Sequence, residues 1–158
     1  MDYHLILPKL YVGSYPGRAD DIKLLKQQAG VTAVLNLQTD DDMRHFKLDW
    51  DSLLGHYRNS AIDVRRVPVR DFDPDDLEVR LPGCVSILNE LMQSGQTVYL
   101  HCSAGTGRSP TVAIAYLFWC CDWDLDRAIT HVTQCRPCSP SIEVISLATA
   151  RVGRVAPT

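Results

Sequence analysis

The residues with the clearest chemistry form one short stretch, His101-Cys102-Ser103-Ala104-Gly105-Thr106-Gly107-Arg108-Ser109. It follows a short apolar run, Thr97 to His101, that predicts a strand, and it precedes an apolar segment, residues 110–121, that predicts a helix. A tight loop between a strand and a helix start gathers unpaired backbone N–H groups and the positive end of the helix dipole around one point. The stretch therefore predicts a phosphate-binding loop.

Two side chains make this predicted loop a reactive site. The field that binds an anion also favours the ionised thiolate of Cys102, which we expect to be the nucleophile. The guanidinium of Arg108, six residues further on, can hold two phosphate oxygens and the added charge of the transition state. The competing interpretation of Cys102 is a buried cysteine that serves only as a small hydrophobic residue, and the arginine and the glycines around it weigh against that interpretation.

The rest of the loop is expected to bind or orient the phosphate group. Glycines let the backbone curl so that successive N–H groups face one centre. A serine hydroxyl can donate a hydrogen bond to the cysteine sulfur, and the histidine is expected to orient the loop rather than act as a base. These predicted phosphate-binding residues are His101, Ser103, Ala104, Gly105, Thr106, Gly107 and Ser109.

A second cluster offers the proton that the leaving alkoxide needs. The loop Arg70-Asp71-Phe72-Asp73-Pro74-Asp75-Asp76 follows a predicted strand at residues 62–69. Loops that follow parallel strands meet at one edge of a sheet, so this loop can reach the cysteine. We predict that Asp71 is the general acid, with Asp73 as the alternative, and that Asp75 or Asp76 caps the next helix.

Strands and helices alternate along the chain, which predicts an α/β fold with a central, mostly parallel twisted sheet flanked by helices. The length of 158 residues suits a single domain. Strands are predicted at 3–6, 10–13, 31–37, 62–69 and 97–101, and helices at 19–29, within 40–59, and at 77–93, 110–121, 125–135 and 141–152, with the helix at 77–93 restarting at Pro82.

Bulk composition excludes several classes of protein. A net charge of −3 gives no basic excess for nucleic acid, and the longest apolar stretch, Val112 to Cys121, is too short to span a bilayer. No signal peptide is visible, so we interpret the six cysteines as reduced thiols in an intracellular, reducing compartment, either cytoplasm or plastid stroma. Cys135 and Cys138 have CxxC spacing but no second pair, so neither a metal nor another cofactor is expected.

The loop HCSAGTGRSP and the upstream Asp loop resemble the dual-specificity branch of the protein tyrosine phosphatases. Further stretches resemble the glucan phosphatases, the group of laforin and the plant starch-excess and like-starch-excess enzymes. These stretches are Tyr3-His-Leu-Ile, Val12-Gly-Ser14, Val34-Leu-Asn-Leu-Gln38, Val69-Arg-Asp-Phe-Asp-Pro74, Arg80-Leu-Pro, Tyr116-Leu-Phe-Trp119 and Arg136-Pro-Cys138. The resemblance covers nearly the whole chain, and nothing is left over for a carbohydrate-binding module.

The resemblance implies hydrolysis of phosphate monoesters on starch-like or glycogen-like glucans through a cysteinyl-phosphate intermediate. It also implies a channel of aromatic side chains that stack on sugar rings, and by position Phe72 and Phe46 are its candidates, with Tyr3 and Trp50 as weaker ones. His45 departs from the family pattern, because the plant enzymes tend to have a second aromatic there.

Other functions remain open at this point. A dual-specificity phosphatase that acts on phosphotyrosine, phosphoserine or phosphothreonine would use the same chemistry with a different groove. A phosphoinositide phosphatase usually has lysines in the loop, and residues 103–107 include none. A non-catalytic phosphate-binding protein would be expected to lack the cysteine, the arginine or the aspartate, and all three are present. The sequence does not indicate an oligomeric state.

Overall fold

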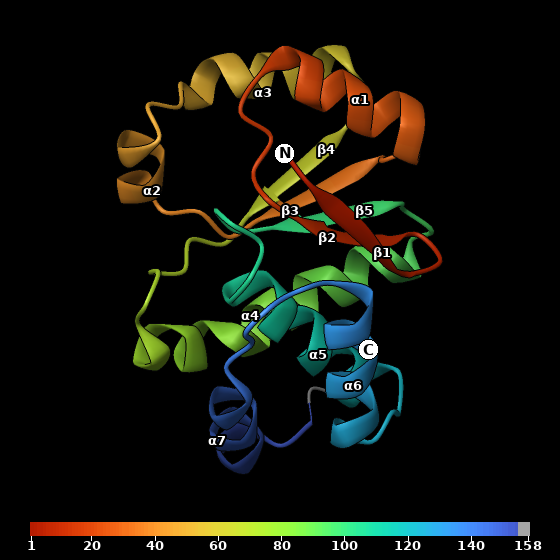
Figure 1. The fold of residues 1–158 in the computed structure, drawn as a ribbon, viewed down its shortest axis with the longest axis vertical. Helices are drawn as coiled ribbons and strands as arrows, with labels where there is room; N and C mark the ends of the chain where they lie inside the picture. The colour runs from red at the N-terminus through yellow and green to blue at the C-terminus, as the bar shows by residue number, and fades with distance from the viewer. Residues whose placement is uncertain (155–158) are drawn as a thin grey trace.

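The computed structural model describes residues 1–154 and contains one five-stranded sheet, in the order β1-β2-β5-β3-β4. Only β1 is antiparallel to its neighbour, and the other three pairings are parallel. This arrangement confirms the predicted α/β fold with a mostly parallel sheet (Figure 1). The strands are β1 (Tyr3–Leu7), β2 (Leu10–Gly13), β3 (Ala33–Asn36), β4 (Asp63–Arg66) and β5 (Val98–His101).

Helices cover both faces of the sheet. Figure 1 shows α1 and α3 on one face and α4 to α7 on the other, while α2 lies beside the edge at which the parallel strands end. The helices are α1 (Ala19–Ala29), α2 (Asp40–His45), α3 (Trp50–Asn59), α4 (Pro74–Gln93), α5 (Arg108–Cys120), α6 (Leu125–Cys135) and α7 (Ile142–Val152). Because the middle strands are covered on both faces, every residue of β3 and β5 is buried, as is typical of a parallel sheet.

The register of the strands brings together the segments in which the sequence predicts catalytic residues. Gly13 at the end of β2 and Asn36 at the end of β3 both pair with His101 at the end of β5, and Asn36 also pairs with Arg66 of β4. The four segments that follow these strands therefore leave the sheet at one edge. The predicted phosphate loop follows the central strand of this set.

Helix α4 differs from the sequence-based prediction in two ways. It begins at Pro74 and is capped by Asp73, whose side chain accepts a hydrogen bond from the backbone N–H of Asp76. The prediction that Asp75 or Asp76 is the cap was therefore wrong, and proline at the first helical position explains the earlier start.

The predicted restart at Pro82 was also wrong, because α4 continues through this residue. Proline has no N–H to donate to the carbonyl four residues earlier, and an interior proline normally breaks a helix for that reason. Here Arg151 of α7 donates to the orphaned Glu78 carbonyl at 3.1 Å, and its Nε also pairs with the Glu78 carboxylate at 3.1 Å. A contact from a distant helix thus supplies the missing hydrogen bond.

Candidate active site

Cys102 follows directly after β5 and lies at the bottom of the predicted phosphate loop. Its side chain is only 3% exposed, and its Sγ lies 3.3 Å from Oγ of Ser109, in the first turn of α5. The predicted hydrogen bond between the serine hydroxyl and the sulfur is therefore sterically available. Since α5 begins at Arg108, its unpaired N–H groups open toward the same loop.

The loop turns sharply at Gly105, which has a φ of +70°. A Cβ atom there would lie 2.3 Å from the Gly13 carbonyl oxygen and 2.8 Å from Nη2 of Arg136, so no other residue fits without displacing backbone. Gly107 has a φ of −117° and open space where a Cβ would be. A left-handed backbone conformation that favours glycine is therefore present at Gly105 and absent at Gly107.

A buried arginine supports the loop from outside. Nε of Arg136, which follows α6, donates to the Gly105 carbonyl at 2.7 Å, and its Nη2 donates to the Ala104 carbonyl at 3.0 Å. The same guanidinium contacts Nδ1 of His4 at 3.0 Å and a carboxylate oxygen of Asp2 at 3.1 Å. The loop is thus tied to the N-terminal segment through one side chain.

Arg108 is nearly buried, and its guanidinium is held by several groups. Nη1 donates to a carboxylate oxygen of Asp42 at 2.8 Å and to the Val69 carbonyl at 2.7 Å, and Nη2 lies 3.1 Å from the Asp71 carboxylate. Burial alone would lower the pKa of Arg108, but the hydrogen bonds and charges of its partners, Asp42 first among the hydrogen-bonding ones, raise it. Arg108 therefore carries its positive charge at every working pH.

His101 contacts the backbone of the loop that the sequence predicts it to orient. Its Nδ1 lies 2.8 Å from the Cys102 carbonyl, so this nitrogen carries the proton and donates. Complete burial lowers the pKa of His101 to about 4, which keeps the ring neutral near pH 7. A neutral ring that bonds to the loop backbone orients the cysteine.

The acid loop lies against the phosphate loop. Asp71 and Cys102 line one cavity of about 430 Å³, together with Gly107 and Arg108. Asp71 reaches Arg108, whereas the carboxylate of the alternative acid, Asp73, is engaged as the cap of α4. The geometry therefore favours Asp71 over Asp73.

A wider groove of about 860 Å³ continues from the acid loop toward α2. Phe72 and Phe46 both line it, as does Tyr15, whose ring lies 4.8 Å from that of Phe46. The two weaker aromatic candidates lie elsewhere: Tyr3 packs edge-on against Tyr11 and Tyr99, and Trp50 lies under Arg66. The groove thus has three aromatic side chains.

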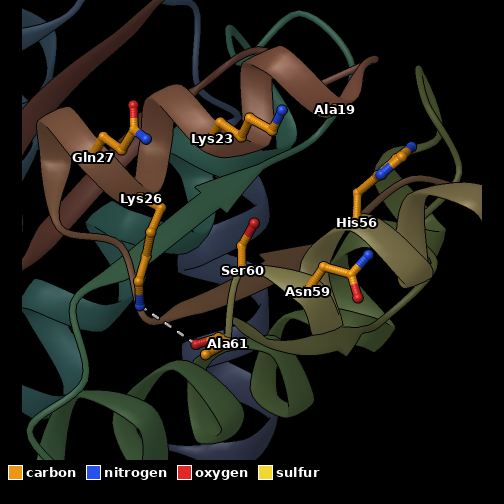
Figure 2. A pocket seen from close by; sticks show the side chains of 8 residues that line it. All are labelled: Ala19, Lys23, Lys26, Gln27, His56, Asn59, Ser60 and Ala61. Atoms are coloured by element: carbon orange, nitrogen blue, oxygen red, sulfur yellow. Dashed lines mark hydrogen bonds between the residues drawn. The ribbon is translucent and has the colours of Figure 1, made fainter.

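Another cavity, of about 600 Å³, lies between α1 and α3 (Figure 2). Figure 2 shows Lys26 reaching the Ala61 carbonyl, with His56 and Lys23 at the rim. The residues that line it include no cysteine and no carboxylate. This cavity is similar in size to the groove, but the residues that line it include neither a cysteine thiol nor an arginine, the pair that the phosphate loop offers.

Sequence reasoning missed three residues of the site: Asp42, Arg136 and Tyr15. Thr39 and Asp42 do show the spacing of a helix capping box, and that box is formed. Nothing in this local pattern indicates that the same carboxylate contacts an arginine 66 residues away. The sequence draws attention to Arg136 only within the CxxC segment and the Arg136-Pro-Cys138 stretch of the family resemblance, and predicts no role for it. Among residues 1–154, the cysteines form no disulfide and no cluster of His, Cys, Asp or Glu could hold a metal.

Residues 10–147 match the family of the dual specificity phosphatase catalytic domain. The chain belongs to this family of cysteine-dependent phosphatases. Among curated relatives, the phosphoglucan phosphatase DSP4 of Castanea sativa is 35% identical and covers 96% of the chain, and laforin of Mus musculus is 30% identical and covers 87%. The chain spans 41% and 44% of these two relatives, so it corresponds to less than half of each.

Solved structures give the same fold. The active form of Tk-PTP superposes with a TM-score of 0.75 at 21% identity, over 96% of this chain and 95% of that one. The human tyrosine phosphatase-like serine/threonine/tyrosine-interacting protein gives 0.74 at 20% identity, over 94% of each chain. No helix within residues 1–154 is long and apolar enough to cross a membrane.

Proposed function

We propose that this chain removes phosphate monoesters from starch-like or glycogen-like glucans through a cysteinyl-phosphate intermediate. Two relatives, a phosphoglucan phosphatase of Castanea sativa and another of Arabidopsis thaliana, support this substrate class. Dual specificity protein phosphatase 2 of Mus musculus is also 34% identical over 131 residues. A phosphoprotein is therefore the second candidate substrate.

In the first step, Sγ of Cys102 attacks phosphorus, an S–P bond forms, and the P–O bond to the sugar breaks. A proton from the Asp71 carboxyl group passes to the departing sugar oxygen. In the second step, water attacks phosphorus and gives its proton to the Asp71 carboxylate, while the S–P bond breaks. The Ser109 hydroxyl, 3.3 Å from the sulfur, stabilises the departing thiolate.

The observation that carries the glucan proposal is the conformation of Phe72. Its side chain is 98% exposed, and its φ is +55°, in the left-handed region that a bulky residue rarely adopts. This backbone conformation costs about 1–2 kcal/mol. Because the ring is exposed to solvent, no hydrophobic burial offsets that cost. An exposed aromatic ring on a strained backbone, directly after the acid, is best explained by a ligand that covers the ring. A sugar ring has a flat apolar face of that size.

Two further aromatic residues that line the groove, Phe46 and Tyr15, support the same proposal. Phe46 is 37% exposed, and Tyr15 lies against it with an angle of 35° between the rings. Together they form a second aromatic surface in the groove that Phe72 also lines. By the family resemblance, His45 stands where the plant enzymes tend to have a second aromatic residue. His45 lies edge-on to Phe46, so Tyr15 is the residue that supplies a second aromatic surface. More than one aromatic surface in a single groove suits a chain of several sugar rings better than one side chain of a peptide.

The test compares phosphate release from solubilised phosphoglucan, para-nitrophenyl phosphate and a phosphotyrosine peptide. The Cys102→Ser variant is the blank, and we expect it to lose at least about a thousandfold on all three. Phe72→Ala and Tyr15→Ala should each lose about tenfold on glucan, a change of about 1.4 kcal/mol, and stay within about threefold on the small ester.

Trp123→Leu is the matched aromatic control, because Trp123 packs with Arg127 and His131 and lines neither cavity of the site. Turnover of the small ester without release from glucan would reject the glucan substrate. If the peptide were then hydrolysed faster than glucan, the phosphoprotein candidate would replace it.

A further inference from the structure

Arg108 has a second carboxylate partner that the reaction steps above do not use. The two oxygens of Asp42 face the two terminal nitrogens of the guanidinium, at 2.8 Å from Nη1 and 3.4 Å from Nη2. Both side chains are enclosed, with 4% of Arg108 and 11% of Asp42 exposed. Ser103 of the phosphate loop donates to the same carboxylate at 3.3 Å.

Asp42 is fixed from its own side of the molecule. It is the third residue of α2, and its carboxylate accepts from the backbone N–H of Thr39 at 2.8 Å and from the Thr39 hydroxyl at 3.0 Å. The hydroxyl in turn accepts from the backbone N–H of Asp42 at 3.1 Å. This reciprocal capping box holds the carboxylate in place whether or not a phosphate is bound.

The remaining donors of Arg108 indicate which side of the guanidinium is left for substrate. Nη1 is taken by Asp42 and by the Val69 carbonyl at 2.7 Å. Nε is buried and has no hydrogen-bond partner among residues 1–154. Nη2 lies 3.1 Å from Asp71, which must turn to the leaving oxygen during the reaction, and it has longer contacts with the Ser103 hydroxyl at 3.3 Å and with Asp42 at 3.4 Å. Nε and Nη2 form the edge that can hold two phosphate oxygens.

We infer that Asp42 is a positioning residue that holds Nη1 of Arg108, directs the Nε–Nη2 edge to the phosphate, and limits how tightly the loop retains it. Asp42 acts through Arg108 and touches no reacting atom. Its negative charge lies beside the guanidinium that is to hold the phosphate, and like charges repel, so it opposes the binding of a phosphate dianion. That repulsion opposes trapping of the product phosphate.

The inference rests on the phosphatase chemistry of the proposed function and not on the glucan substrate. The experiment therefore measures the binding of inorganic phosphate and of tungstate by calorimetry, which needs no turnover, and kcat and KM for para-nitrophenyl phosphate. If the protein bound phosphate and tungstate but did not hydrolyse para-nitrophenyl phosphate, the proposed function would be rejected. The role of Asp42 in anion binding would still be tested by calorimetry.

The variant Asp42→Asn keeps the shape and one acceptor but removes the charge. We expect phosphate to bind at least about tenfold more tightly, and kcat to fall about tenfold because the guanidinium is less firmly held and the product leaves more slowly. Asp42→Glu restores the charge at a longer reach, so its phosphate affinity should return to within about twofold of the native value while kcat stays low.

Two controls separate this effect from simpler ones. Asp40→Asn removes an equal charge from the same helix at an exposed position paired with Arg66, and should leave phosphate affinity unchanged. Thr39→Ala breaks the capping box without changing the charge, and should lower stability without tightening phosphate binding. Unchanged or weaker phosphate binding in Asp42→Asn, or equal tightening in Thr39→Ala, would reduce Asp42 to a helix cap and overturn the inference.

Discussion

The phosphate loop and the acid loop meet at one site but are built differently. The phosphate loop is held from several directions: His101 bonds its backbone, Arg136 bonds the carbonyls of Ala104 and Gly105, and Ser139 donates to the Thr106 carbonyl at 2.7 Å. In the acid loop, residues 70–72 are all exposed, and Phe72 is held in a strained backbone conformation. A rigid loop suits charge stabilisation, which depends on donors fixed in advance, whereas exposed residues suit recognition of a large substrate.

The strongest test of this contrast removes the support of the phosphate loop. In Arg136→Met the carbonyls of Ala104 and Gly105 lose their buried donors, so the loop should shift by a fraction of an ångström or more. We expect activity on every phosphate ester to fall on the order of 100-fold. The free energy of unfolding should fall by about 3 kcal/mol, because buried acceptors are left unpaired.

The measurements are kcat/KM on small and large substrates and urea unfolding. Arg127→Met on α6 is the control, since this arginine is exposed and lies over the Trp123 ring, a contact worth about 1 kcal/mol. A selective loss on glucan alone would contradict the assignment of Arg136 to the phosphate loop.

The second test uses pH and the buried His101. Its folded-state pKa of about 4 lies below the ordinary value of 6.5, so between these values the unfolded chain binds more protons. Stability is therefore fully present above pH 6.5 and is lost as the pH falls toward 4, by roughly 3 kcal/mol. The pKa of Asp42 is also lowered, because hydrogen bonds from Arg108 and Thr39 outweigh its burial, but its contribution is lost only below its ordinary value of 3.8.

Urea unfolding between pH 7 and 4.5 checks this prediction, because that window lies above the titration of Asp42. His101→Gln should flatten the dependence of the free energy of unfolding on pH. If the free energy of unfolding of the native protein did not change with pH over this range, or if it changed as steeply in the variant, His101 would not control the pH dependence of stability.

The smallest expected effect belongs to the acid loop. Phe72→Gly removes the left-handed strain and an exposed ring, so the free energy of unfolding should rise by about 1 kcal/mol. The same variant should lose glucan turnover while keeping most of its turnover of para-nitrophenyl phosphate. Thermal unfolding and the two assays measure both quantities, and Val79→Ala, at an exposed position on α4, is the control. A fall in stability would mean that Phe72 is held in place for structural reasons.

Patterns local in the chain allowed most of the fold and the centre of the site to be predicted. The alternation of strands and helices indicated the sheet, and α1 and α6 have the predicted boundaries. The course of α4 through Pro82 was not predictable, because its missing donor comes from Arg151, 73 residues after Glu78. Local sequence rules predict that an interior proline ends a helix, because it leaves a backbone carbonyl without a donor. Here a donor from a distant residue satisfies that carbonyl.

The sequence by itself was enough to predict Cys102, Arg108 and Gly105 as the centre of the site. A loop that must curl around an anion within a few residues requires particular residue types at particular positions. The tertiary structure decided which other side chains surround this loop. Asp42 reaches Arg108 across 66 residues, and Arg136 reaches Gly105 across 31. Asp42 meets Arg108 because α2 follows β3 and the parallel register ends four chain segments at one edge of the sheet, whereas Arg136 reaches the loop from the end of α6. No local pattern encodes either meeting.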